Sequence, residues 1–173
     1  RRLKELACHD PLSGLRNRRG FEQALAEEVE RIRRYGSSAS VILVDIDDFK
    51  RVNERHGHDV GDEMIQAVGH RLEALARNTD IVGRIGGDEF MVLAVETTME
   101  NGLQLAERIR ESFQEALGDV AGGELYVSIS CGVAAVTPTR IELKDLVADA
   151  SDGLAIAKGL GKNTVSTSRV STS

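Results

Sequence analysis

Apolar side chains recur every three or four positions in four stretches of the chain, and this spacing is typical of one face of an α-helix. The four sets are Phe21, Leu25, Val29 and Ile32; Ile65, Val68, Leu72 and Leu75; Leu105, Ile109, Phe113 and Leu117; and Leu143, Leu146, Val147, Ala150 and Leu154. Gly36 closes the first set, as the end of a helix often requires. We therefore predict four helices that each bury one side.

Other stretches have the apolar patterns of β-strands. Residues 40–44, SVILV, are apolar on both faces and indicate a central strand. Residues 81–85 and 90–95 predict two strands joined by a short turn, and apolar residues alternate from Val127 to Val133. The Ser/Thr-rich residues 163–173 are either a short strand or a frayed end.

The predicted elements follow the order helix, strand, helix, hairpin, helix, strand, helix and strand, with no repeat and no internal linker. Elements that alternate in this way pack as helices against a sheet. We predict one α/β domain with a central, partly antiparallel five-stranded sheet that is flanked by helices.

Composition limits the function classes. The chain has 173 residues, of which 41% are hydrophobic and 29% charged, which is typical of one soluble globular domain. Its net charge of −6 and its 3% aromatic residues argue against a nucleic-acid binder, because binding nucleic acid needs a basic face and stacking platforms. Any anionic ligand must therefore be held by local positive charge.

The cysteines and the chain ends bear on the compartment. Cys8 and Cys131 have neither disulfide-framework nor metal-ligand spacing, so we expect a reducing cytoplasm. No apolar run approaches the ~18 residues of a membrane span, so we expect no direct membrane contact by this domain. The first residues carry no signal-peptide core. Leu3 and Leu6 read like the last turn of a helix ended by Asp10 and Pro11, so we expect residues 1–10 to be the end of an upstream signalling helix or linker.

Two acids lie where predicted strands end. Asp45 directly follows the central strand, and Asp88 lies at the tip of the hairpin. If the strands are neighbours, the carboxylates converge, and Mg²⁺ usually binds through one or two carboxylates plus substrate phosphates. Gly86 and Gly87 allow a nucleotide to approach the backbone closely. The alternative is an ordinary Gly-Gly turn with solvated acids.

Four motifs carry a resemblance to a known family. They are the signature GGDEF at 86–90, DPLSGLRNRRGF at 10–21, DIDDFKRVNERHGHDVGDE at 45–63 and AKGLGKN at 157–163. In this order they closely resemble the GGDEF-domain family, the diguanylate cyclases, over residues 7–166. The resemblance implies a palm-like fold, with residues 11–166 as the catalytic domain and 167–173 as a C-terminal tail. It also implies condensation of two GTP into cyclic di-GMP with release of pyrophosphate.

The resemblance implies roles for single residues. Asp45 and Asp88, with the Ile46 carbonyl, would bind a pair of Mg²⁺ ions, for which Mn²⁺ is an alternative. Glu89 would help with the second metal or deprotonate the attacking 3′-hydroxyl, and Gly86 and Gly87 complete the catalytic turn. The substrate-binding residues would be Asp48, Phe49, Lys50, Lys158 and Lys162 for the phosphates, and Asn53 and Asp62 for the guanine edge.

A further site is implied by the Arg77-x-x-Asp80 pair, which matches the family's inhibitory site for cyclic di-GMP; the alternative is a pair on a helix surface. Lys158 and Lys162 have the alternative of stabilising a helix end. His56 and His58 form an H-x-H, but two nitrogen ligands are too few to favour zinc.

The chain departs from the family pattern at two positions. Ala155 stands where the family usually has tyrosine, which affects local packing more than chemistry. Lys162 stands where arginine is more usual, which retains the charge but loses the bidentate fork.

The implied chemistry needs two copies of the chain. The product has two equivalent phosphodiester bonds, so two half-sites must face each other across a two-fold axis, and a homodimer is needed for turnover. We expect an upstream sensor to regulate this output domain, which lies in the cytoplasm even if the longer chain is membrane-anchored. The alternative function is a catalytically idle GGDEF module that binds GTP or cyclic di-GMP and regulates an attached domain.

Overall fold

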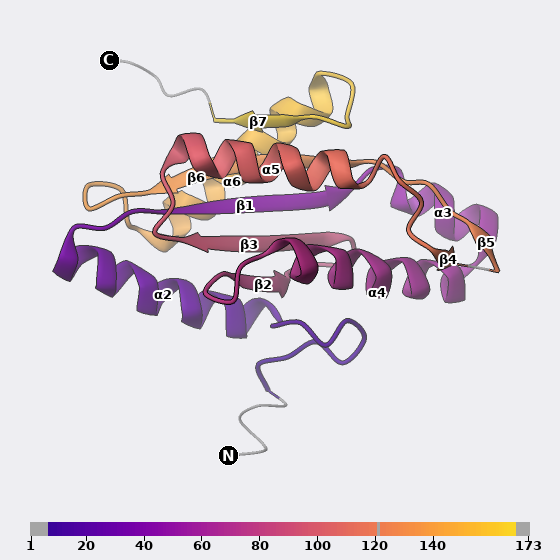
Figure 1. Ribbon diagram of the computed structural model, residues 1–173, viewed down its shortest axis with the longest axis horizontal. Helices are drawn as coiled ribbons and strands as arrows, with labels where there is room; N and C mark the ends of the chain where they lie inside the picture. Colours follow the sequence, from indigo (N-terminus) through magenta and orange to yellow (C-terminus); the bar gives the residue numbers. More distant parts are fainter. Residues whose placement is uncertain (1–6, 121, 169–173) are drawn as a thin grey trace.

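The computed structural model describes residues 7–120 and 122–168, which form a mixed sheet with helices on both faces (Figure 1). The sheet has the strand order β2-β3-β1-β6-β7, and a separate two-stranded sheet is made by β4 and β5. The elements are α2 (Arg18–Tyr35), β1 (Ala39–Ile46), α3 (Phe49–His56), α4 (His58–Leu75), β2 (Ile81–Arg84), β3 (Glu89–Val95), α5 (Met99–Ser112), β4 (Asp119–Val120), β5 (Gly123–Glu124), β6 (Ile129–Val136), α6 (Leu143–Gly159) and β7 (Val165–Thr167).

The pairing of the strands confirms the predicted partly antiparallel five-stranded sheet. Strand β1 pairs antiparallel with β3 and with β6, and β2 pairs antiparallel with β3. Only β6 and β7 run parallel among the pairs of this sheet. All eight residues of β1 are buried, as expected for the central strand of a sheet covered on both faces.

Alternate residues of the strands pack into two separate hydrophobic cores, one on each face of the sheet. Ile42, Val44 and Ile46 of β1 face one core, which α4 and α5 cover. Val41 and Leu43 face the other core, which α2 and α6 cover. Asp45 continues this second alternation, so the backbone pattern directs its side chain toward the α2 and α6 side.

The helices differ from the sequence prediction in two places. A separate helix, α3, precedes α4, and Gly57 separates them with a φ of 89°. No residue of α3 is fully buried, and its apolar stripe is limited to Phe49 and Val52, which pack partly buried against the core and are too few to reveal a helix from spacing. Helix α5 ends at Ser112, although Phe113 and Leu117 of the predicted stripe are still buried in the α4 and α5 core. They reach that core from the turns after the helix.

The remaining differences are short. Strand β6 begins at Ile129 rather than at 127, and the two-residue strands β4 and β5 are too short to leave a periodic pattern. The Ser/Thr-rich segment forms strand β7 at Val165–Thr167, which decides between the two alternatives for these residues. The helix end expected at Leu3 and Leu6, and the tail 169–173, lie outside the described residues. None of the helices in the described part of the chain is long and apolar enough to cross a membrane.

Candidate functional site

The acids of two motifs meet at one end of the sheet. Strand β1 runs toward the end where α3 begins, and the turn between β2 and β3 lies at the same end (Figure 1). Asp45 is the register partner of Glu89, and the Ile46 N–H donates to the Asp88 carbonyl oxygen at 3.2 Å. The expectation that the two strands are neighbours is confirmed. Asp45 lies within β1, one residue before its end, rather than after the strand.

Asp45 is a buried charge with a cationic partner. Its residue is 3% exposed, and its carboxylate forms an ion pair with the Lys158 ammonium from α6. A buried carboxylate is tolerated only when it is paired, so the pair explains how an acid can end the central strand. Burial, and then the nearby Lys162, lower the pKa of Lys158 below its usual value.

The signature turn is held by Arg84, for which the sequence analysis predicted no role. Arg84 donates two hydrogen bonds to the Gly87 carbonyl, at 3.2 and 2.9 Å, and forms an ion pair with Asp10 at 3.2 Å. At Gly86, an added Cβ would lie 2.9 Å from the Glu89 Oε2 atom, so the end of the Glu89 side chain would have to shift. The opening motif DPLSGL could have indicated Asp10, but its partner Arg84 is distant in sequence.

Asp10 is also bound by its own turn. Ser13 donates to the Asp10 carboxylate from its backbone N–H at 2.8 Å and from its hydroxyl at 2.7 Å. Burial raises the pKa of Asp10, but the hydrogen bonds from Ser13 and Arg84 outweigh it and leave the pKa below its usual value. The charged carboxylate is therefore the form that ties the first motif to the signature turn.

The N-terminus of α3 carries a second lysine contact. Asp48 precedes the helix in the left-handed region, with a φ of 57°, and its carboxylate accepts from the Lys162 ammonium at 2.6 Å. That hydrogen bond is the main reason why the pKa of Asp48 lies below its usual value. The first N–H groups of a helix have no partner within the helix and favour anions, so a cation and free N–H donors lie together here.

Asn53 and Asp62 come from opposite sides of the seam between α3 and α4. The Asn53 Oδ1 atom is buried and has no hydrogen-bond partner among the described residues. A Cβ at Gly61 would collide with this atom, so the glycine leaves the space in which the amide lies. Asp62 is the next residue of α4 and is exposed. The structure thus places a buried acceptor without a partner on α3 and an exposed carboxylate on α4.

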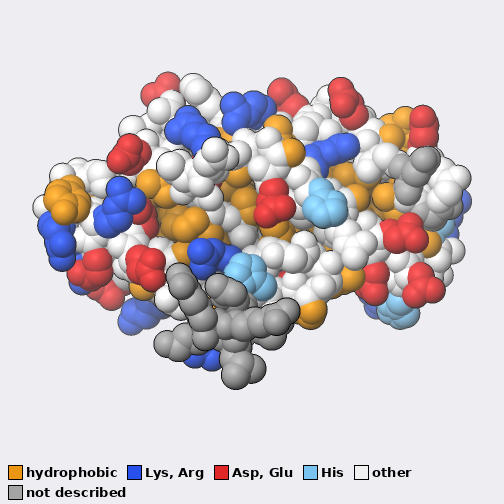
Figure 2. Space-filling model, turned by 60° about the horizontal axis from the view of Figure 1, so that its bottom comes forward, with side chains coloured by type: hydrophobic (Ala, Val, Ile, Leu, Met, Phe, Trp, Pro, Cys, Tyr) orange, Lys and Arg blue, Asp and Glu red, His pale blue; other side chains and the backbone are white. Residues whose placement is uncertain are grey.

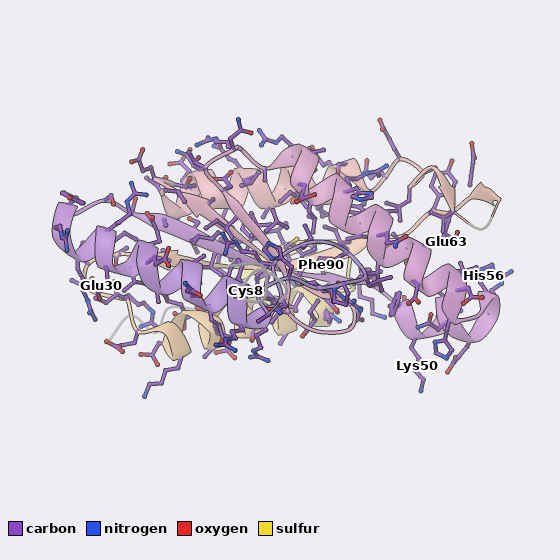
Figure 3. The ribbon with its side chains drawn as sticks, turned by 90° about the horizontal axis from the view of Figure 1, so that it is seen from below. Cys8, Glu30, Lys50, His56, Glu63 and Phe90 are labelled. Carbon is purple, nitrogen blue, oxygen red and sulfur yellow. The ribbon has the colours of Figure 1, made fainter. Side chains whose placement is uncertain are left out.

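The fold does not bring the Lys50 side chain together with Lys158 and Lys162. Its side chain is 89% exposed and pairs with Glu54 one turn along α3, at 3.7 Å. Figure 3 shows Lys50 projecting from α3 away from the body of the molecule. A cavity of about 640 Å³ lies on another side of α3, where Asp48, Arg51 and Tyr126 are among its lining residues.

The Arg77-x-x-Asp80 pair lies in the turn between α4 and β2. The alternative of a helix surface is wrong, because α4 ends at Leu75. The Asp80 carboxylate accepts from the Arg77 N–H at 2.9 Å and from the Val95 N–H at 3.2 Å, so it shapes the turn and fastens the end of β3. Asp80 also lines a cavity of about 280 Å³, and Asn78 is among the other lining residues.

The site contains few protein groups for a metal ion. Among residues 7–120 and 122–168, no three His, Cys, Asp or Glu side chains form a group that could hold a metal. Two carboxylates, Asp45 near the end of β1 and Asp88 in the turn before β3, are nevertheless the donor set that Mg²⁺ takes when substrate phosphates supply the remaining oxygens. The residues present therefore fit Mg²⁺ with a nucleotide better than a metal held by protein alone.

Charge elsewhere on the surface is mixed. On the face in Figure 2, acidic and basic side chains alternate, and no extended basic patch appears among the side chains that are coloured. This agrees with the net charge of −6. An anionic ligand would therefore depend on local groups such as Lys158 and Lys162 rather than on the field of a whole face.

Comparisons with known proteins agree with the motifs. A family model described as "Diguanylate cyclase, GGDEF domain" matches residues 7–164. Over 163 residues the chain is 39% identical to the response regulator PleD of Caulobacter vibrioides, covering 93% of this chain and 36% of PleD. It is 35% identical over 163 residues to the probable diguanylate cyclase DgcC of Escherichia coli K12, covering 94% of this chain and 44% of DgcC.

The fold is similar to a solved structure. The coiled coil and GGDEF domain of DgcB from Caulobacter crescentus, in complex with c-di-GMP, matches with a TM-score of 0.87 and 25% identity. The match covers 95% of this chain and 87% of that chain. The chain spans less than half of the length of PleD and of DgcC.

Proposed function

Because this chain belongs to the GGDEF-domain family of diguanylate cyclases, we propose that it condenses two GTP molecules into cyclic di-GMP and releases two pyrophosphates. The observation that carries the proposal is the meeting of the Asp45 strand with the Asp88 turn, beside Lys158. Acids for a metal and a cation for phosphate are the groups that nucleotidyl transfer needs.

We assign metal binding to Asp45, Asp88 and the Ile46 carbonyl. When bound, a Mg²⁺ pair lowers the pKa of the attacking 3′-hydroxyl and neutralises charge on the α-phosphate and the leaving pyrophosphate. Mn²⁺ suits the same oxygen ligands. Glu89, in register with Asp45, either supports the second metal or accepts the proton of the 3′-hydroxyl.

The phosphates are assigned to the N-terminus of α3 and to the lysines of α6 and its following turn. The N–H groups of Asp48 and Phe49 can donate to phosphate oxygens, as helix N-termini do. Lys158 and Lys162 are already near these groups through their contacts with Asp45 and Asp48. Lys50 can join only by leaving Glu54, so we expect it to contribute less.

Guanine recognition is assigned to Asn53 and Asp62. Both present acceptors, and guanine offers a matching pair of donors, its N1–H and its amino group, whereas adenine lacks the N1–H. The Asn53 Oδ1 atom is buried beside Gly61 without a partner, so the amide must turn toward the base to accept from it. We expect GTP to bind at least about tenfold more tightly than ATP. Equal binding of the two nucleotides in calorimetry would remove both residues from the site.

Turnover requires a second copy of the chain, because each GTP attacks the other across a two-fold axis. We also propose that cyclic di-GMP binds at Arg77 and Asp80 and slows the reaction. The upstream part of the longer protein would control how two domains meet, and we place the domain in the cytoplasm. These assignments extend to the whole protein only as proposals, since the chain covers a fraction of its relatives.

The metal assignment is tested with Asp45→Asn and Asp88→Asn. Each variant should lose Mg²⁺-dependent formation of cyclic di-GMP, because the amide is a poor ligand for a hard cation. Circular dichroism and urea unfolding should show that the fold is kept. Turnover near the parental rate in either variant would remove that residue from the metal site.

A further inference from the structure

Asp47 is a buried carboxylate outside the roles assigned above. It follows the Ile46 carbonyl and precedes the Asp48 cap of α3, yet it is only 5% exposed. Burying a charged group is costly unless hydrogen bonds satisfy it. The buried Asp47 carboxylate therefore needs hydrogen-bond donors within the protein.

The donors to Asp47 come from two distant segments. Its Oδ2 atom accepts from the Ser128 hydroxyl at 2.7 Å and from the Asn163 N–H at 3.0 Å. Its Oδ1 atom accepts from the Ser130 hydroxyl at 2.7 Å. All three donors are uncharged, and both oxygens are in use. The carboxylate thus joins the end of β1 to the start of β6 and to the turn after α6.

The turn that Asp47 holds has an unusual backbone. Lys162 and Asn163 are consecutive residues in the left-handed region, with φ of 66° and 47°, which L-residues rarely adopt in succession. The Asn163 backbone is fixed by Asp47, and its side chain accepts from the Arg110 guanidinium at 3.2 Å. Such a conformation persists only where surrounding contacts impose it.

The turn determines where the Lys162 ammonium lies. From this turn Lys162 reaches the Asp48 carboxylate at the N-terminus of α3. Asp47 and Lys162 are thus coupled, because the N–H group that donates to Asp47 belongs to Asn163, the residue after Lys162.

We propose that Asp47 is a positioning residue, which fixes the turn 162–163 so that Lys162 is held over the phosphate-binding end of α3. This inference rests on the proposed function, because it assumes that Lys162 binds phosphate. We assign Asp47 no contact with substrate or metal, because both of its oxygens already accept from Ser128, Ser130 and Asn163.

The pattern of donors makes asparagine a sharp test. The Asn163 N–H can only donate, so the atom at the Oδ2 position must remain an oxygen. The Ser130 hydroxyl can also accept, so an NH₂ group at the Oδ1 position keeps a hydrogen bond there. Asp47→Asn therefore preserves the connections without the charge, whereas Asp47→Ala removes all of them.

The experiment compares the two variants in steady-state kinetics with GTP and Mg²⁺. Asp47→Ala should raise the KM for GTP at least about tenfold, the effect of losing a charge-assisted hydrogen bond, and change kcat less than about threefold. Asp47→Asn should keep KM within about threefold of the parent. Asp149→Asn is the matched control, because this carboxylate pairs with Arg140 away from the turn, and its KM should be unchanged.

A second readout does not depend on turnover. Amide hydrogen exchange at Asn163, measured without nucleotide, should accelerate in Asp47→Ala and remain slow in Asp47→Asn. If the parent forms no cyclic di-GMP, the proposed function fails, and the Kd for GTP from calorimetry replaces KM in the same comparison. If Asp47→Ala does not fold, the Ser128→Ala and Ser130→Ala double variant replaces it, and it should raise KM or Kd in the same direction.

Three results would overturn the inference. One is a loss of kcat in Asp47→Asn as large as in Asp45→Asn, which would make Asp47 a metal ligand. Another is an equal rise of KM in Asp47→Asn and Asp47→Ala, which would show that charge and not position matters. The last is parental KM or Kd in Asp47→Ala, or in the double serine variant where that is used.

Discussion

The contact between Asp10 and Arg84 gives a prediction that can be worked out from the structure. Asp10→Asn keeps the size of the side chain and an acceptor for Ser13 but removes the charge that faces Arg84. Both side chains of the pair are 17% exposed. Fully exposed pairs contribute ~0.2–1 kcal/mol, and breaking a buried pair costs ~3–5 kcal/mol. We therefore expect the free energy of unfolding at pH 7 to fall by about 1–2 kcal/mol.

The pH dependence of this loss has a definite sign. The pKa of Asp10 is lower in the folded protein than its ordinary value of 3.8, so its charged form stabilises the fold above that value. The contribution is lost as the pH falls through the folded pKa. The difference between parent and Asp10→Asn should thus be constant from about pH 5 to 7 and shrink below about pH 4.

Urea unfolding followed by circular dichroism at several pH values measures this difference. Glu22→Gln is the control, because its ion pair with Arg18 is largely exposed, and it should change the free energy by less than about 0.5 kcal/mol at any pH. Because Arg84 also holds the Gly87 carbonyl, Asp10→Asn should slow turnover as well. A difference at pH 7 no larger than that of Glu22→Gln, or one that stays constant down to pH 3, would show that the charge of Asp10 does not stabilise the fold through Arg84.

Three further predictions concern packing and regulation. Gly132→Ala should lower the free energy of unfolding by about 3 kcal/mol in urea titrations, because a Cβ there meets the backbone of α6, whereas Gly159→Ala has open space and should not destabilise. Gly61→Ala should weaken GTP binding about tenfold in calorimetry with little loss of stability, because the new Cβ displaces the movable Asn53 amide; unchanged affinity would contradict the guanine site. Arg77→Ala should keep the initial rate but let product accumulate beyond the level at which the parent stalls, and identical progress curves would contradict the inhibitory site.

Local sequence patterns were sufficient to predict the central strand and the strand that pairs with it at the site. The apolar run that includes Val41 to Val44 has few polar positions because helices cover both faces of β1, and this made the central strand recognisable. The acids Asp45 and Asp88 were predicted to meet because each adjoins a strand, and the register confirms that these strands are adjacent.

Features that depend on distant contacts were not predictable from spacing. Helix α3 is short, and its apolar stripe consists only of Phe49 and Val52, which are partly buried against the core. After helix α5 ends at Ser112, the Arg71 guanidinium from α4 donates to the carbonyls of Ser112, Glu115 and Ala116. The sequence around α5 gives no sign of this distant donor. The donors to Asp47 are separated from it by 81 to 116 positions. In the sequence alone, such a carboxylate cannot be distinguished from a surface acid, because its donors lie far away along the chain.

Formation of cyclic di-GMP from GTP by this domain can be measured in one assay. The purified chain is incubated with GTP and Mg²⁺ over a range of protein concentrations, and the nucleotides are identified by mass. We expect cyclic di-GMP, with two pyrophosphates for each, and a specific activity that rises with protein concentration because two half-sites must meet. GTP that binds but yields no cyclic di-GMP at any concentration would show that the domain is an idle regulatory module instead.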